Sequence, residues 1–216
     1  MGITEIERDL KFIRQAMESS SRYTNVPASG YLLTGLLGLA GTWGTFAFLG
    51  REKIADTTFI TSRDIRILIA IWALVLVTAV GSVAFCSWRK ARKYGRSAWN
   101  SIVTRMLLSQ IPLLVVTGVL TFAMTKEGYF AFIPGMWLGI YGTVLYSFSY
   151  FTSIEHKIEG TAFIILGVTV MFIHGASGLA LLGVGFGGIH LVAGIWRLFS
   201  ERKAQRLSTN LQEHPE

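Results

Sequence analysis

The sequence GVGFGGIHLVAGIWR, residues 183–197, decides the fold class of this chain. It is apolar enough to lie in a membrane, and five glycines surround a single imidazole, His190. Side chains this small let a neighbouring helix approach closely, and a polar ring in such a segment must find a partner on that neighbour. The stretch therefore predicts a membrane helix that packs tightly and carries His190 to a helix contact.

The composition extends this prediction to the whole chain. Its 216 residues are 51% hydrophobic and 15% charged, whereas a soluble domain carries about 25% charged residues. The apolar residues come in runs of about 20, the length that crosses a hydrocarbon core of about 30 Å. We therefore predict an all-α fold, a polytopic membrane bundle.

These runs predict six transmembrane helices preceded by a short soluble segment. The predicted spans lie near residues 29–49, 65–88, 102–124, 130–151, 159–176 and 179–198. The fifth and sixth share one apolar stretch, which we divide near 175–178 because a single helix of that length would far exceed the bilayer. The membrane domain then covers 29–199, and 200–216 is expected to be a disordered, polar cytoplasmic tail.

Residues 1–28 are predicted to form a cytoplasmic amphipathic helix and a linker. Thr4 and Glu7 have the spacing of a capping box. One face of this helix collects apolar side chains, namely Ile3, Ile6, Leu10, Ile13 and Met17. The pattern lasts about two heptads, which is too short for a coiled coil. The face is expected either to lie against the bundle or the lipid, or to dock a protein partner or a second copy.

Lysine and arginine indicate the orientation. With the N-terminus inside, 15 of the 20 basic residues fall on cytoplasmic segments, and this bias predicts that both termini lie in the cytoplasm. The loop after the second predicted span concentrates Arg89, Lys90, Arg92, Lys93 and Arg96. Such a cluster is able to bind anionic lipid head groups. Nucleic-acid binding is not expected, because no reader fold accompanies the charge.

Few polar side chains occur within the predicted spans. No aspartate or glutamate lies in the interior of any span, which argues against proton pumps and ion-coupled transporters, since these bury carboxylates. Gln110 precedes Pro112, which should kink its helix, and the amide is expected to join spans or face a polar cavity. His190 is interpreted as a hydrogen-bonding group at a helix contact or as a ligand or proton site.

A haem site requires two axial imidazoles at matching depth. By the predicted spans, His174 lies near the outer end of one helix and His190 about 18 Å along the next, so one haem cannot easily join them. Glu155, His156 and Glu159 cluster in a short cytoplasmic loop, but a metal site would need more ligands. We therefore expect no metal and no cofactor.

Glycines on the predicted helices are interpreted as close-packing positions. They are Gly35, Gly38, Gly135, Gly139, Gly183, Gly187 and Gly188. The same positions could join copies into a homo-oligomer.

Three sequence blocks carry a resemblance. They are IRQAMESSSRYTNVPASGYLLTGLLGLAG (Ile13–Gly41), IPGMWLGIYG (Ile133–Gly142) and GFGGIHLVAGI (Gly185–Ile195). They resemble blocks of a group of uncharacterised bacterial integral membrane proteins with six spans, associated with acidobacteria and similar organisms. The resemblance implies the topology and carries no activity.

Three function classes remain open at this point. No catalytic constellation is present, so we expect a non-enzymatic scaffold, accessory or regulatory subunit of the inner membrane. The first alternative is a channel or transporter for a neutral or weakly polar solute, with His190 and Gln110 in a polar cavity. The second is a haem-associated or redox-associated membrane subunit.

Overall fold

The computed structural model describes residues 10, 26–93, 104, 107–150, 152–173 and 176–213. Helices dominate these ranges, and no strand occurs within them. The elements are α2 (Ala28–Ala55), η1 (Thr57–Phe59), α3 (Ser62–Lys93), α5 (Ile111–Lys126), η2 (Phe130–Phe132), α6 (Ile133–Phe148), α7 (Ile154–Phe172), α8 (Ala176–Gly183), the π-helical η3 (Val184–Ile189) and α9 (His190–Glu213). The last three form one continuous rod.

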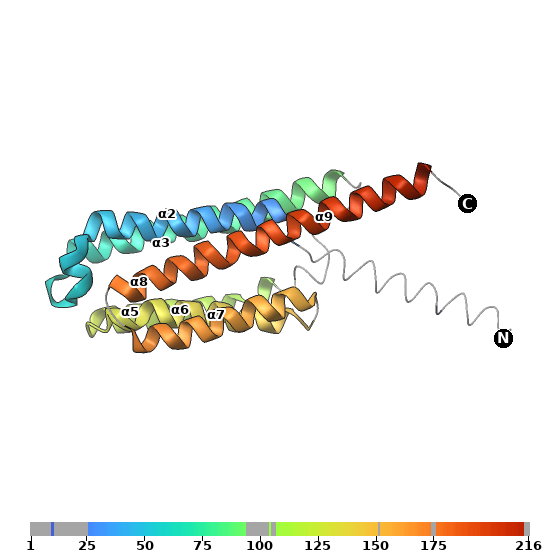
Figure 1. The fold of residues 1–216 in the computed structure, drawn as a ribbon. Coiled ribbons are helices and arrows are strands. Elements are labelled where there is room, and N and C mark those ends of the chain that lie inside the picture. The colour runs from blue at the N-terminus through green and yellow to red at the C-terminus, as the bar shows by residue number, and fades with distance from the viewer. Residues whose placement is uncertain are drawn as a thin grey trace.

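The helices lie in two layers (Figure 1). One layer contains α2, α3 and α9, and the other contains α5, α6 and α7. In the first layer α2 packs against α3 on one flank and against η3 and α9 on the other. In the second layer α6 and α7 pack closely along their length, with α5 beside α6. The η3 segment and α8 also contact α6 and α7, so the last rod connects the two layers.

Within the described ranges, four helical segments are long and apolar enough to cross a membrane, which indicates a membrane protein. They are Ala28–Gly50, Ser62–Lys93, Phe130–Phe148 and Ser177–Lys203. Their outward surfaces are apolar as well, since large side chains such as Trp43 and Val192 are exposed. Between them, α5 is a shorter apolar helix of 16 residues, and α7 begins with charged residues.

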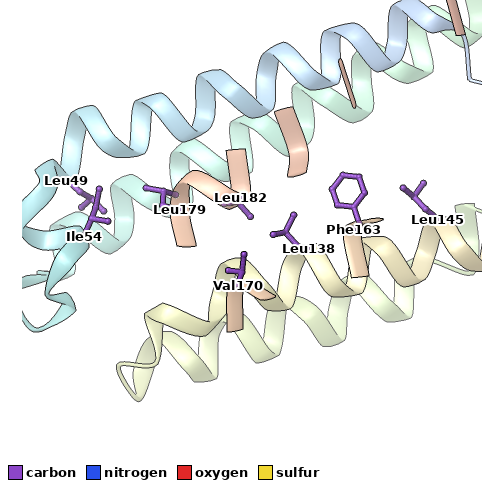
Figure 2. Packing of buried hydrophobic residues seen from close by; sticks show 8 residues of the cluster. All are labelled: Leu49, Ile54, Leu138, Leu145, Phe163, Val170, Leu179 and Leu182. Carbon is purple, nitrogen blue, oxygen red and sulfur yellow. The ribbon is translucent and has the colours of Figure 1, made fainter. Parts of the chain in front are cut away.

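The buried apolar cluster is small and lies where the layers meet (Figure 2). Leu138, Leu145, Phe163 and Val170 come from α6 and α7, Leu179 and Leu182 from α8, and Leu49 and Ile54 from the end of α2. Leu138 and Val170 are completely buried, at 0% exposure. The layers are therefore joined by side chains on the continuous last rod and its neighbours.

Several boundaries differ from the prediction. The α9 helix continues to Glu213, so the expected disordered tail is helical over most of its length. This part of the chain contains good helix formers and no glycine, and its proline comes only at Pro215. α7 begins at Ile154, five residues before the predicted span.

The helix before Pro112 is interrupted, as its position suggested. Residues 109–110 form a turn, and α5 starts at Ile111 with proline in its first turn. Proline is accepted there because the first helical N–H groups have no intrahelical partner. The apolar stretch of the last two predicted spans also divides near the expected place, since α7 ends at Phe172 and α8 begins at Ala176.

Candidate functional site

A large groove separates α3 from the α5–α6 pair, and we call it the lateral groove. Its volume is 2080 Å³, about twice the upper end of the range for pockets that hold drug-sized ligands. Aliphatic and aromatic side chains form most of its walls, including Leu76 and Val80 of α3, Leu114 of α5, and Trp137 and Ile140 of α6. Residues of α2, α8 and η3 also line it. The groove therefore offers a long, mostly apolar site between the two layers.

A hydrogen-bonded pair from α6 and α9 lies among the residues that line the lateral groove. The hydroxyl of Tyr141 and the Nε2 of His190 share a hydrogen bond of 2.8 Å, and both residues line the groove. Tyr141 lies in the middle of α6, and His190 is the first residue of α9. Because His190 Nε2 already has this partner, binding a haem iron through that atom would require the bond to break.

Three aromatic rings pack around His190. The ring centroids of Phe163, Tyr31 and Phe186 lie 5.3, 5.8 and 6.3 Å from that of the imidazole. His190 is only 3% exposed. The predicted helix-contact position therefore corresponds to a buried imidazole bound to Tyr141 and packed among aromatic rings.

A second polar cluster joins α2, α7 and α9, and it is built around an ion pair. The Nη2 of Arg197 donates a hydrogen bond of 2.7 Å to Oε1 of Glu159. The hydroxyl of Tyr31 donates to Oε2 of the same carboxylate at 3.2 Å. The guanidinium also lies over the Tyr31 ring, with Cζ 4.1 Å from the ring centroid. Charge, hydrogen bond and cation–π contact thus converge on three side chains from three helices.

His156 completes this buried cluster. Its Nε2 lies 3.1 Å from the Tyr31 hydroxyl, and its Nδ1 lies 3.1 Å from the hydroxyls of Thr152 and Ser153. Burial, followed by the nearby Arg197 charge, lowers the pKa of His156 to about 4. The ring is therefore neutral at physiological pH and acts as a hydrogen-bonding group.

Two statements made from the sequence need correction here. His156 and Glu159 do not lie in a cytoplasmic loop, because both are buried on α7. The prediction that the interior of the bundle lacks acidic groups is also wrong, since Glu159 is buried against Arg197. The cause is local: α7 begins earlier than its apolar run, and its second turn carries the carboxylate inward.

The glycine-rich η3 segment allows the last rod to lie directly on α2. A Cβ on Gly35 would lie 2.9 Å from the carbonyl oxygen of Gly187, and one on Gly38 would lie 2.7 Å from that of Phe186. The wide π-helical turn ends at His190 and so sets the position of the imidazole. Such turns occur frequently at functional sites.

The other predicted glycine positions fall into two groups. A Cβ on Gly135 would lie 2.8 Å from the carbonyl oxygen of Gly167, one on Gly183 would lie 2.9 Å from Thr42 Cγ2, and one on Gly187 would meet the Leu39 side chain. By contrast, a Cβ on Gly139 would have nothing within 4 Å, and one on Gly188 only a Val184 methyl at 3.8 Å.

The remaining predicted residues lie apart from these clusters. Gln110 lines the lateral groove, and its amide donates a hydrogen bond to Ser109 Oγ. Arg89, Lys90 and Lys93 also line the groove, whereas the Arg92 guanidinium lies over the Trp88 ring. His174, Arg96 and four residues of the N-terminal apolar face (Ile3, Ile6, Ile13 and Met17) lie outside the described residues. Leu10 of that face is exposed.

Tyr31, Tyr141, Glu159 and Arg197 were missed as site residues. One signal in the sequence pointed to the ion pair. Glu159 lies near the start of one apolar helix and Arg197 near the end of the next, and a short turn joins these two helices. When two such helices are antiparallel, the start of the first lies beside the end of the second, so the two opposite charges lie at the same depth in the bundle.

Comparisons of the chain with protein-family models, with curated proteins and with solved structures found no match. The resemblance to bacterial six-span membrane proteins therefore stays a prediction.

Proposed function

We propose that this chain is a six-span protein of the bacterial inner membrane and that both its termini lie in the cytoplasm. In this arrangement α5 and α7 cross the bilayer together with the four longer helices. The basic residues at the end of α3 and in the first part of the tail support the orientation, because cytoplasmic segments carry an excess of lysine and arginine.

We infer further that the protein binds an amphipathic, lipid-like molecule in the lateral groove. The observation that carries this proposal is the 2080 Å³ volume with largely aliphatic and aromatic walls. A concave apolar surface contacts a hydrocarbon chain on several sides, whereas the convex surface of a single helix contacts it on one. The Tyr141–His190 pair adds a polar contact among the lining residues.

The character of the walls separates this proposal from transport of a neutral polar solute. That alternative requires a continuous polar path to His190, and the groove that reaches His190 is mainly apolar. A lipid-like ligand suits such walls better than a hydrated solute, because an apolar wall cannot replace the hydrogen bonds of the water that the solute loses.

The scaffold or accessory-subunit hypothesis rests on the N-terminal apolar face. Apart from Leu10, the residues of that face lie outside the described residues. That hypothesis stays a prediction, and it is compatible with a ligand in the groove.

The test is to fill the groove and measure ligand retention. Ala73 lines the groove on α3, while Ala70, about one turn earlier on the same helix, does not; both are exposed. Native mass spectrometry of the purified protein should show a bound lipid-like molecule in the wild type and in Ala70→Trp, and its loss in Ala73→Trp. Equal retention by both tryptophan variants, or no bound molecule in the wild type, would overturn the proposal.

A further inference from the structure

We propose that the lateral groove selects a phospholipid with a net anionic head group, and that Arg89, Lys90 and Lys93 bind this head group. This inference rests on the proposed lipid-binding function and adds the chemistry of the ligand. All three side chains belong to the last turns of α3, and all three line the groove at the end where α3 approaches α9.

The charge of the groove is uneven along its length. At the end of the groove that the last turns of α3 line, which we call the inner end, three of the described lining residues are basic and one, Glu201, is acidic. At the opposite end the only charged lining residue within the described chain is Lys53. Its Nζ donates to both carboxylate oxygens of Asp64, at 2.8 and 3.0 Å, so its charge is neutralised locally. An anionic head group is therefore attracted to the inner end.

The Lys90–Glu201 ion pair marks the position of this head group. Lys90 Nζ lies 2.7 Å from Glu201 Oε1, and both side chains are about one-third exposed, at 36% and 37%. A phosphate at this place would compete with the carboxylate for the same ammonium group. Basic pockets between membrane helices on the cytoplasmic side bind anionic head groups in this way.

The geometry leaves room for the acyl chains of the same molecule. Glu201 follows His190 by eleven residues of continuous helix, which corresponds to about 16 Å along the axis. A head group beside Lys90 therefore directs its chains along the apolar walls and past the Tyr141–His190 pair. The head group then contacts the basic end of the groove, and the acyl chains contact its apolar walls.

Arg92 provides the matched control for this site. It belongs to the same turn of α3 and is also exposed, but it does not line the groove, and its guanidinium lies 5.4 Å from the centroid of the Trp88 ring. Loss of Arg92 removes the same charge from the same membrane surface without altering the groove.

The experiment measures binding of phosphatidylglycerol and of phosphatidylcholine with identical acyl chains, by native mass spectrometry of the detergent-solubilised full chain. The wild type should bind phosphatidylglycerol at least about tenfold more tightly. Arg89→Gln combined with Lys93→Gln should bring the two affinities together, and Arg92→Gln should leave the ratio unchanged. Excess glycerophosphoglycerol, a phosphodiester that carries the head group and its single charge but no acyl chains, should not displace the lipid.

Each other outcome contradicts a defined part of the proposal. Equal binding of the two lipids by the wild type, or equal losses in the Arg92 and Arg89/Lys93 variants, overturns the head-group assignment and leaves the lipid-binding function standing. Displacement of the lipid by glycerophosphoglycerol overturns the claim that the acyl chains are held along the groove. Binding of neither lipid overturns the proposed function itself, as does a dimer of the chain whose contact fills the groove.

Discussion

The layer formed by α2, α3 and α9 faces the second layer along a closed side and an open side, and these two sides use charge in different ways. On the closed side, where α7 packs against this layer, the Arg197–Glu159 pair is 2.7 Å long and its side chains are 8% and 10% exposed. On the open side, along the lateral groove, the Lys90–Glu201 pair has the same length but is about one-third exposed. The closed side thus uses its charges to hold helices together, whereas the open side keeps charges accessible to a ligand.

The largest expected effect comes from breaking the buried pair. Arg197→Met leaves the Glu159 carboxylate buried without its cation, and this should reduce the free energy of unfolding by about 3–5 kcal/mol. The matched change on the open side, Lys90→Met, should cost at most about 1 kcal/mol, because a partly exposed pair contributes little. Both values are measurable by denaturant unfolding in detergent micelles.

A double variant separates the ion pair from general loss of packing. Arg197→Met combined with Glu159→Gln removes the buried charge together with its partner, so it should recover part of the stability lost in Arg197→Met alone. Equal losses of stability in Arg197→Met and Lys90→Met would contradict the difference between the closed and the open side.

The second prediction concerns the close contact between α6 and α7. A Cβ on Gly167 would lie 2.5 Å from the backbone nitrogen of Gly139, whereas a Cβ on Gly139 meets nothing within 4 Å. Gly167→Ala should therefore destabilise the bundle by about 1–3 kcal/mol through overpacking, and Gly139→Ala should not. Thermal melts in detergent that place the two variants together would argue against the α6–α7 geometry.

The third prediction applies one substitution to both sides. Val170 is fully buried on the closed side, while Val80 lines the groove and is 60% exposed. Val170→Phe should cost about 1–3 kcal/mol because the closed side has no space for the larger ring. Val80→Phe should change stability by less than about 0.5 kcal/mol. A large loss in the Val80 variant would mean that the groove is closed in the folded protein.

The smallest expected effect is a dependence on pH through His156. Its pKa falls from 6.5 to about 4 in the folded chain, so below pH 6.5 the unfolded chain binds a proton that the folded chain excludes. The stabilisation is therefore complete above pH 6.5 and is lost as the pH falls to about 4. The melting temperature of the wild type should fall more steeply over this range than that of His156→Asn.

The contrast with the asparagine variant isolates the imidazole. The neighbouring carboxyl groups of Glu155 and Glu159 are present in both proteins, so the comparison removes only the imidazole. Parallel pH profiles would show that His156 does not exchange a proton on unfolding.

The sequence predicted the helical class and most helix positions because long apolar runs depend on local composition. The break before Pro112 and the division near 175–178 followed from the same local rules. The buried cluster did not, because it depends on which helices become neighbours: Tyr31 and His156 are 125 positions apart. A carboxylate at the edge of an apolar run looks solvated until its helix is known to begin a turn earlier.

The groove could not be predicted for a related reason. The apolar faces of α3, α5 and α6 look alike in sequence whether they touch one another or face an open space. The groove between α3 and the α5–α6 pair depends on tertiary packing. It arises because α2 packs against the last rod and so places α3 at the edge of its layer.

The most direct test of the account is to map where a lipid chain contacts the protein. Phosphatidylglycerol with a photoreactive group on its acyl chain would be cross-linked to the full chain and the adducts located by mass spectrometry. We predict adducts on the groove-lining Leu76 and Val80 of α3 and Ile140 of α6, at the expense of the exposed Leu74 and Val77, which do not line the groove. Adducts distributed evenly around α3, with none on α6, would contradict the claim that the groove holds a lipid.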